Sequence, residues 1–290
     1  GSGYGNDTTR GLWEGHFPAT HERAPNAHVV ATHYHPDHLG NTAWLAKRFD
    51  APVSMTQAEF LTAHALLDQR ATHALPDTCA LFMSHGLERD QVEALAARGN
   101  AYARGVPEAP RTIERMIAGD TVRFGGQDWT VIPGYGHSPE HASLHSPSSG
   151  ILISGDMLLP RISTNVSVWP VEPEGDPVGR FLGSLASFER LPGDTLVLPS
   201  HGMPFRGIAA RVAELRAHHD ARLSELEEAL ADAHDPRSAG DLVPVLFRRP
   251  LDLQQRFFAT GEAIAHLNHL WRTGRATRVV EPDGAVRFSA

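Results

Sequence analysis

The amino-acid sequence predicts an α/β protein, because short apolar strand patterns alternate with segments of helical periodicity along most of the chain. Four of the predicted strands end in a tip that is rich in glycine and in histidine or aspartate. With 290 residues, the chain is long enough for one large domain, or for a large domain with a small appendage. We therefore expect a mixed fold with a polar site at one edge of a sheet.

The composition is typical of a globular protein, with 41% hydrophobic and 21% charged residues. The formal net charge of −8 does not favour a polyanionic partner. Cys79 is the only cysteine, which excludes an intramolecular disulfide and a Cys₄ or Cys₂His₂ zinc site, and we expect it to be a buried apolar filler. No segment has the apolar length of a membrane span and no signal-peptide pattern opens the chain, so we expect a cytoplasmic protein.

The first half of the chain is expected to place its first strand at 27–32, because residues 1–26 contain no clear strand pattern. A helix at 41–49 and a short strand at 52–55 follow. The segment 57–118 then changes character. Three stretches within it, separated by proline and glycine, show helical periodicity: 57–70, 87–98 and 110–118. We expect this segment to form a helical insertion.

The second half of the chain begins with a predicted hairpin, in which two strands meet across Gly125 and Gly126. Two further apolar runs predict strands at 151–154 and 195–198. Periodicity then predicts a long helix, two shorter helices and a terminal hairpin: 212–233, 239–247, 254–271 and 277–288. Helices followed by a hairpin are typical of a winged-helix appendage.

A histidine-rich segment follows the first predicted strand directly. His33, His35, Asp37 and His38 place three imidazoles and a carboxylate within six residues. Neutral imidazole and carboxylate are the ligands that divalent metals such as Zn²⁺ prefer. A strand that delivers them at its end predicts a metal site at the mouth of a sheet.

Three later strand ends repeat this pattern, and they deliver His137, Asp156 and His201. The donor types suit a two-metal site, because one carboxylate has two oxygens and can bridge both ions. The seven candidate ligands then divide into two sets and one shared residue: His33, His35 and His137; Asp37, His38 and His201; and Asp156 between them. A water shared by two such ions is deprotonated near neutral pH, which predicts hydrolytic chemistry.

These residues resemble the signature of the metallo-β-lactamase superfamily, which is His-x-His-x-Asp-His followed by single His, Asp and His ligands in that order. The resemblance holds at all seven positions and covers roughly residues 4–207. It implies an αββα sandwich with two divalent ions, commonly zinc, with iron or manganese in some members. Family members carry further strands before the cluster, whereas 32 residues precede His33 here, so we expect the first strands to be missing.

The resemblance implies a dinuclear metal-dependent hydrolase, in which a metal-bridging hydroxide attacks the substrate and Asp37 and Asp156 are the catalytic residues. The expected substrate is a small molecule with an ester or thioester bond, such as an acyl-CoA or a glutathione conjugate. The catalytic domain would span 1–207 with the insertion 57–118 as a lid, and 208–290 would form the winged-helix region.

Other functions stay open. The C-terminal region is similar to the tail of lactamase-like endoribonucleases and has modest basic character, so RNA cleavage is the alternative, although the net charge favours an ordinary solvated surface. A lactonase is a further candidate. A non-catalytic binding protein is disfavoured because no ligand is missing, and the C-terminal region could equally serve as a homodimer element. No membrane partner is expected.

The remaining histidines are not expected to bind a metal. His141 is expected beside the metals rather than as a ligand. A metal-bound His137 cannot act as the general base for Ser138, which argues against a serine hydrolase. The histidines of the long C-terminal helix and the segment after it, His218, His219 and His234, are expected on a solvated surface.

Overall fold

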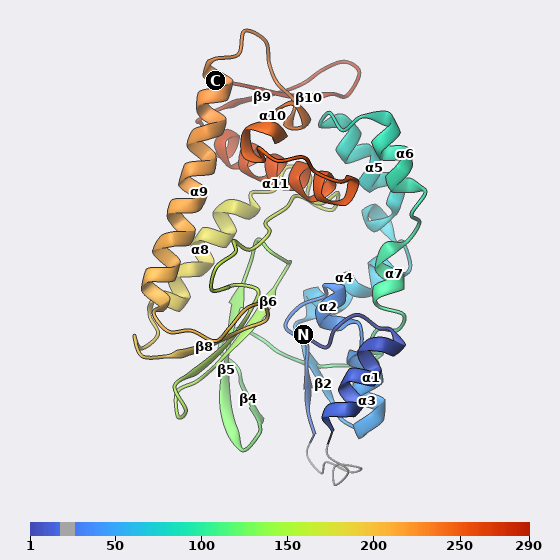
Figure 1. The fold of residues 1–290 in the computed structure, drawn as a ribbon, viewed down its shortest axis with the longest axis vertical. Helices are drawn as coiled ribbons and strands as arrows, with labels where there is room; N and C mark the ends of the chain where they lie inside the picture. The colour runs from blue at the N-terminus through green and yellow to red at the C-terminus, as the bar shows by residue number, and fades with distance from the viewer. Residues whose placement is uncertain (18–26) are drawn as a thin grey trace. The chain divides into compact units, whose positions relative to one another are not determined.

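The structure is a computed structural model that describes residues 1–17 and 27–290 (Figure 1). By contact density the chain divides into two compact units, and each is described by itself. The sheet unit contains both larger sheets and comprises three ranges: 1–70, 100–162 and 184–209. The helical unit comprises the remaining ranges: 71–99, 163–183 and 210–290.

Two sheets form the centre of the sheet unit, and Figure 1 shows the first two strands of the smaller one in blue and the larger one mainly in green. The smaller sheet is parallel and has the strand order β1-β2-β3: Val29–Val30, Val53–Met55 and Glu114–Arg115. The larger sheet has the order β4-β5-β6-β7-β8: Thr121–Phe124, Gln127–Gly134, His141–Ser146, Ile151–Gly155 and Leu196–Pro199. Its pairs are antiparallel except for β7 and β8, which run parallel.

Apolar side chains join the two sheets. Trp129, Val131 and Leu144 of the larger sheet are buried together, and Val30 of β1 packs against this cluster. A second buried cluster, which includes Leu39 and Met55, joins the smaller sheet to its helices. Those helices are α2, α4 and α7: Pro36–Leu39, Gln57–Leu67 and Ala101–Gly105. Helix α3 (Thr42–Phe49) contacts β1 outside this cluster. This layering confirms the predicted αββα sandwich class.

The sequence pattern explains most of these elements. Gly125 and Gly126 both have positive φ, 59° and 74°, which the tight turn between β4 and β5 requires. The predicted strands at 27–32, 52–55, 151–154 and 195–198 all appear, the first of them shorter than expected. Strand β6 was not predicted. It lies in the middle of the sheet with all six residues buried, but four of the six are polar and only Ala142 and Leu144 are apolar, so no apolar run marks it as a strand.

The prediction of a helix at 110–118 is wrong. Residues Glu114–Arg115 form β3, because Ser54 and Met55 of β2 pair with them and the Met116 amide donates to the Met55 carbonyl at 3.0 Å. This long-range pairing overrides the helical periodicity of the segment. Residues 7–16 form a helix, α1 (Asp7–His16), that was not predicted. The side chain of Asn6 caps it by accepting from the Thr9 amide at 2.9 Å.

The helical unit contains the remaining elements, and their bounds agree with most predictions for the C-terminal part of the chain. The helices are α5, α6, α9, α10 and α11: Leu75–Ser84, Arg89–Ala96, Ile208–Ala231, Ala239–Leu246 and Leu253–Arg272. Helix α9 begins at the last residues of the sheet unit, and α8 (Pro177–Glu189) likewise contributes to both units. Capping boxes start α10 and α11. The terminal hairpin pairs β9 (Thr277–Val280) with β10 (Val286–Ser289), as predicted.

The prediction that His219 lies on a solvated surface is wrong, whereas His234 is exposed as expected. His219 is 1% exposed, and its Nδ1 lies 3.0 Å from Nε2 of the buried His266. Nδ1 of His266 donates to the Glu262 carbonyl at 2.8 Å, so its Nε2 is the acceptor and His219 is the donor. Burial and the neighbouring histidine lower the pKa of His219 to about 3, and burial lowers the pKa of His266 to about 4.

This buried pair predicts a loss of stability in acid. Between the unfolded pKa of about 6.5 and the folded values, only the unfolded chain binds protons on these histidines, so the free energy of unfolding falls as pH falls. Each histidine contributes up to about 1.4 kcal/mol per pH unit. Urea unfolding of the chelator-treated protein at pH 7, 6 and 5 should therefore show a steeper pH dependence than the double variant His219→Leu/His266→Leu. Equal slopes would contradict the assignment.

No helix among the described residues is long and apolar enough to cross a membrane.

Candidate metal centre

The seven predicted ligands all lie in the sheet unit, and each follows the end of a strand. The loop after β1 presents His33 and His35, and the short helix α2 presents Asp37 and His38. Pro36 at the first position of α2 fixes the turn from one pair to the other. The other three ligands follow later strands: His137 after β5, Asp156 after β7 and His201 after β8.

The first set of predicted ligands consists of three histidines whose ring nitrogens face one another. His33 Nε2 lies 3.0 Å from His35 Nδ1 and 3.2 Å from His137 Nε2. His33 and His137 are buried, and His35 is half-buried. The structure therefore brings the first predicted set together as one group of potential metal ligands.

The second set combines a carboxylate with two histidines. Asp37 Oδ2 lies 3.3 Å from His38 Nε2 and 3.2 Å from His201 Nε2. His38 is buried, whereas the His201 side chain is 47% exposed. These three residues also form one group of potential ligands, and solvent reaches the group from the side of His201.

Asp156 lies between the two sets. Its Oδ1 is 3.3 Å from His38 Nε2, and its Oδ2 is 3.4 Å from His137 Nε2 and 3.6 Å from His201 Nε2. One carboxylate therefore contacts histidines of both sets, as expected of the residue predicted to bridge them.

The donor atoms fit divalent cations. Ligands at 2.0–2.1 Å from a tetrahedral Zn²⁺ lie about 3.3 Å from one another, and the contacts within both sets are 3.0–3.3 Å. Burial lowers the pKa values of His33 and His35 well below their usual range, so both imidazoles are neutral. Burial raises the pKa of Asp37, but the hydrogen bond and charge of His38 outweigh it and bring the value to about 2. His33, His35 and Asp37 therefore have the protonation states that metal ligands need. Burial lowers the pKa of His38, but its hydrogen bonds to Asp156 and Asp37 outweigh it and raise the pKa, so a metal bound there would displace a proton.

His141 lies beside the ligands, where it was expected, and it holds Asp156 in place. Its Nε2 accepts a hydrogen bond from the Asp156 amide at 3.1 Å, and burial and the neighbouring His137 lower its pKa to about 3. Gly155 has φ of 53°, and a Cβ at that position would lie 2.2 Å from His141 Nε2. Only glycine at position 155 therefore allows His141 to pack close enough to accept the hydrogen bond from the Asp156 amide.

Sequence analysis missed one buried acid beside the ligands. Glu59 of α4 is fully buried, and it accepts hydrogen bonds from residues next to the first set of histidines. It lies in the predicted helical insertion, more than 20 residues from His35, and its helix shows no local signal that links it to the metal motif.

The sequence that contains this centre matches known protein families, and the fold resembles solved structures. A family model for the metallo-beta-lactamase superfamily matches residues 23–201, and a model for the metallo-beta-lactamase-like C-terminal domain matches residues 223–290. A crystal structure of a beta-lactamase domain protein from Burkholderia ambifaria is 42% identical with a TM-score of 0.89, and the match covers 99% of this chain and 82% of that one.

Two curated relatives extend this similarity. A probable metallo-hydrolase of Bacillus subtilis (strain 168) is 25% identical over 254 residues, which are 83% of this chain and 74% of that protein. A hydroxyacylglutathione hydrolase of Cereibacter sphaeroides (strain ATCC 17025 / ATH 2.4.3) is 31% identical over 109 residues, which are 38% of this chain and 40% of that protein. The superfamily model spans more than half of the chain, so the chain belongs to the metallo-β-lactamase superfamily and is a metallo-hydrolase.

Proposed function

We propose that this metallo-hydrolase holds two divalent ions, most simply Zn²⁺, and cleaves a small ester or thioester. The observation that carries the proposal is the position of Asp156, whose two oxygens lie close to histidines of both ligand sets. When bound, two such ions supply a hydroxide nucleophile near neutral pH and polarise the substrate carbonyl.

The predicted ligands would bind the two ions as two separate sets. His33, His35 and His137 would hold one ion with neutral imidazoles, and Asp37, His38 and His201 would hold the other with one negative charge. The buried His33 and His38 close one side of the centre. The His201 side chain is 47% exposed, which leaves the centre open to substrate and solvent at that residue.

The ester or thioester class is supported by a relative and by charge. The similarity to a hydroxyacylglutathione hydrolase, although it covers only 40% of that protein, favours an acyl thioester of modest size. The net charge of −8 argues against a polyanionic substrate.

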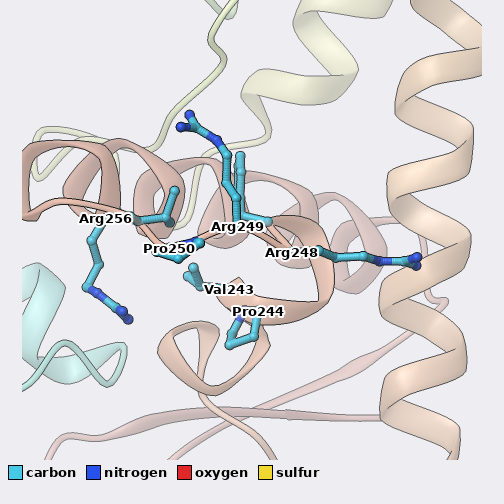
Figure 2. A pocket seen from close by; sticks show the side chains of 8 residues that line it. Val243, Pro244, Arg248, Arg249, Pro250 and Arg256 are labelled. Atoms are coloured by element: carbon cyan, nitrogen blue, oxygen red, sulfur yellow. The ribbon is translucent and has the colours of Figure 1, made fainter.

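The alternative, RNA cleavage, depends on the arginines of the helical unit. Arg248, Arg249 and Arg256 line a pocket of about 380 Å³ together with apolar residues of α10 and the following loop. Figure 2 shows that the three arginine side chains extend in different directions. Arg248 also lies 3.6 Å from Glu225. These arginines form no convergent cradle for a phosphate, so we favour the small-molecule substrate.

We retain a division into a catalytic domain at 1–207, with 57–118 as its insertion, and a C-terminal winged-helix-like region at 208–290. The match of a separate C-terminal family model to residues 223–290 supports it, as does the hairpin that follows α10 and α11. Part of the insertion, 71–99, belongs to the helical unit together with the C-terminal residues. Cytoplasmic location and a homodimer stay predictions.

The proposed function predicts the metal content. Protein loaded with Zn²⁺ and freed of excess metal should contain two equivalents by elemental analysis, and Asp156→Ala should contain fewer. The variant should lose more than about 100-fold in kcat/KM, since even an outer partner of a ligand is worth 10–100-fold. The exposed Asp194→Ala serves as the control and should match the wild type. Two retained equivalents with full turnover in Asp156→Ala would contradict the bridging role.

The second prediction concerns substrate class. A panel of acyl-CoA and acyl-glutathione thioesters, simple esters, lactones and nitrocefin should give the highest kcat/KM with an ester or thioester. Chelator should abolish that activity, and added Zn²⁺ should restore it. Highest turnover of nitrocefin or of a lactone would replace the proposed class.

The third prediction concerns RNA. Single-stranded RNA should remain uncut by enzyme that turns over its small substrate. The double variant Arg248→Ala/Arg249→Ala should leave small-substrate turnover unchanged. RNA cleavage that weakens steeply with salt and disappears in this variant would favour the endoribonuclease instead.

A further inference from the structure

Glu59 is a buried acid that the proposed chemistry does not use. It lies in the first turn of α4 with 0% exposure. Its Oε2 accepts from the Tyr34 amide at 2.9 Å, and its Oε1 accepts from Ser138 Oγ at 2.6 Å and from the Glu140 amide at 2.7 Å. Among the described residues, no lysine or arginine forms an ion pair with it.

The three donors belong to the two segments that carry the first ligand set. Tyr34 lies between His33 and His35, and Ser138 directly follows His137. Segments more than 100 residues apart in the chain are thereby tied to one carboxylate, with one oxygen facing each segment.

The same two segments are held from their other side as well. The Tyr34 carbonyl accepts from Tyr102 Oη at 2.7 Å, and the Glu140 carbonyl accepts from Thr56 Oγ1 at 2.8 Å. Thr56 precedes α4 and does not cap it with its side chain. The residue that would normally stabilise the helix start instead contacts the ligand segment, which is consistent with α4 acting as a support for the centre.

The donor pattern favours an ionised carboxylate at Glu59. The amides of Tyr34 and Glu140 can only donate, and they face different oxygens of Glu59. An amide side chain would direct its own N–H at one of them and leave a buried N–H without an acceptor, and a neutral acid would be a weaker acceptor. Burial raises the pKa of Glu59 to about 6, opposed by these hydrogen bonds. A cation held by His33, His35 and His137 would supply the countercharge that the protein itself does not.

We propose that Glu59 is a positioning residue, which aligns His33 and His35 with His137 and thereby raises the affinity of that set for a divalent ion. The proposal rests on the two-metal site of the proposed function. It differs from a purely structural role, because a structural residue would change the melting temperature without changing the affinity of one metal site selectively.

The test is a stepwise Zn²⁺ titration of the full-length chain against a chromophoric chelator. Glu59→Gln keeps the shape of the side chain but removes its charge and one acceptor. It should weaken one of the two sites by about 10–100-fold and leave the other within about threefold. His201→Ala marks the second site, so the site that weakens in Glu59→Gln should be the one that His201→Ala spares. Val131→Ala, in the core between the sheets, should lower the melting temperature without changing either affinity.

The outcomes separate the inference from the proposed function. If the wild type binds fewer than two ions, the two-metal proposal fails. If it binds two and Glu59→Gln matches it at both sites, Glu59 is structural and the inference is wrong. Should Glu59→Gln not fold, Ser138→Ala decides, because it removes one of the three hydrogen bonds. We expect it to weaken the same site by about threefold or more, and unchanged affinity there would overturn the inference.

Discussion

The close approach of the seven predicted metal-ligand side chains is the constraint on which the rest of the sheet unit depends. Neutral imidazoles whose ring nitrogens lie 3.0–3.2 Å apart have only one N–H each to share among their neighbours, and the carboxylates of Asp37 and Asp156 add negative charge to the same small volume. Rigid elements must hold the backbone to keep such a group together, and bound cations would stabilise it further. Two sheets with a common apolar core provide that rigidity, and the ligands follow their strand ends.

Residues behind the ligands satisfy this constraint in two different ways. His141 accepts from the Asp156 amide and requires glycine at position 155, so it fixes the predicted bridging residue through the backbone. Glu59 accepts from amides next to the histidines of the first set, so it connects segments that are distant in sequence. Both contacts act on main-chain groups beside the ligands, which leaves the ligand side chains free to face the centre.

The sequence was sufficient to predict which side chains lie together, because the candidate ligands occur in short local patterns. His33, His35, Asp37 and His38 share one short segment, and each later ligand follows an apolar run that is recognisable as a strand. Features that depend on long-range partners were missed. The helix expected at 110–118 became a strand because β2 pairs with it, and His219 is buried because His266, 47 residues later, is its partner. Glu59 was missed for the same reason, since its three donors come from segments on both sides of it in sequence.

The central claim, that one carboxylate lies between two metal ions, is tested most directly by a crystal structure of the Zn²⁺-loaded protein with anomalous data at the zinc edge. The account predicts two peaks about 3.5–4 Å apart. One should lie against His33, His35 and His137, the other against Asp37, His38 and His201, with Asp156 between them. A single peak, or two peaks that do not share Asp156, would contradict it.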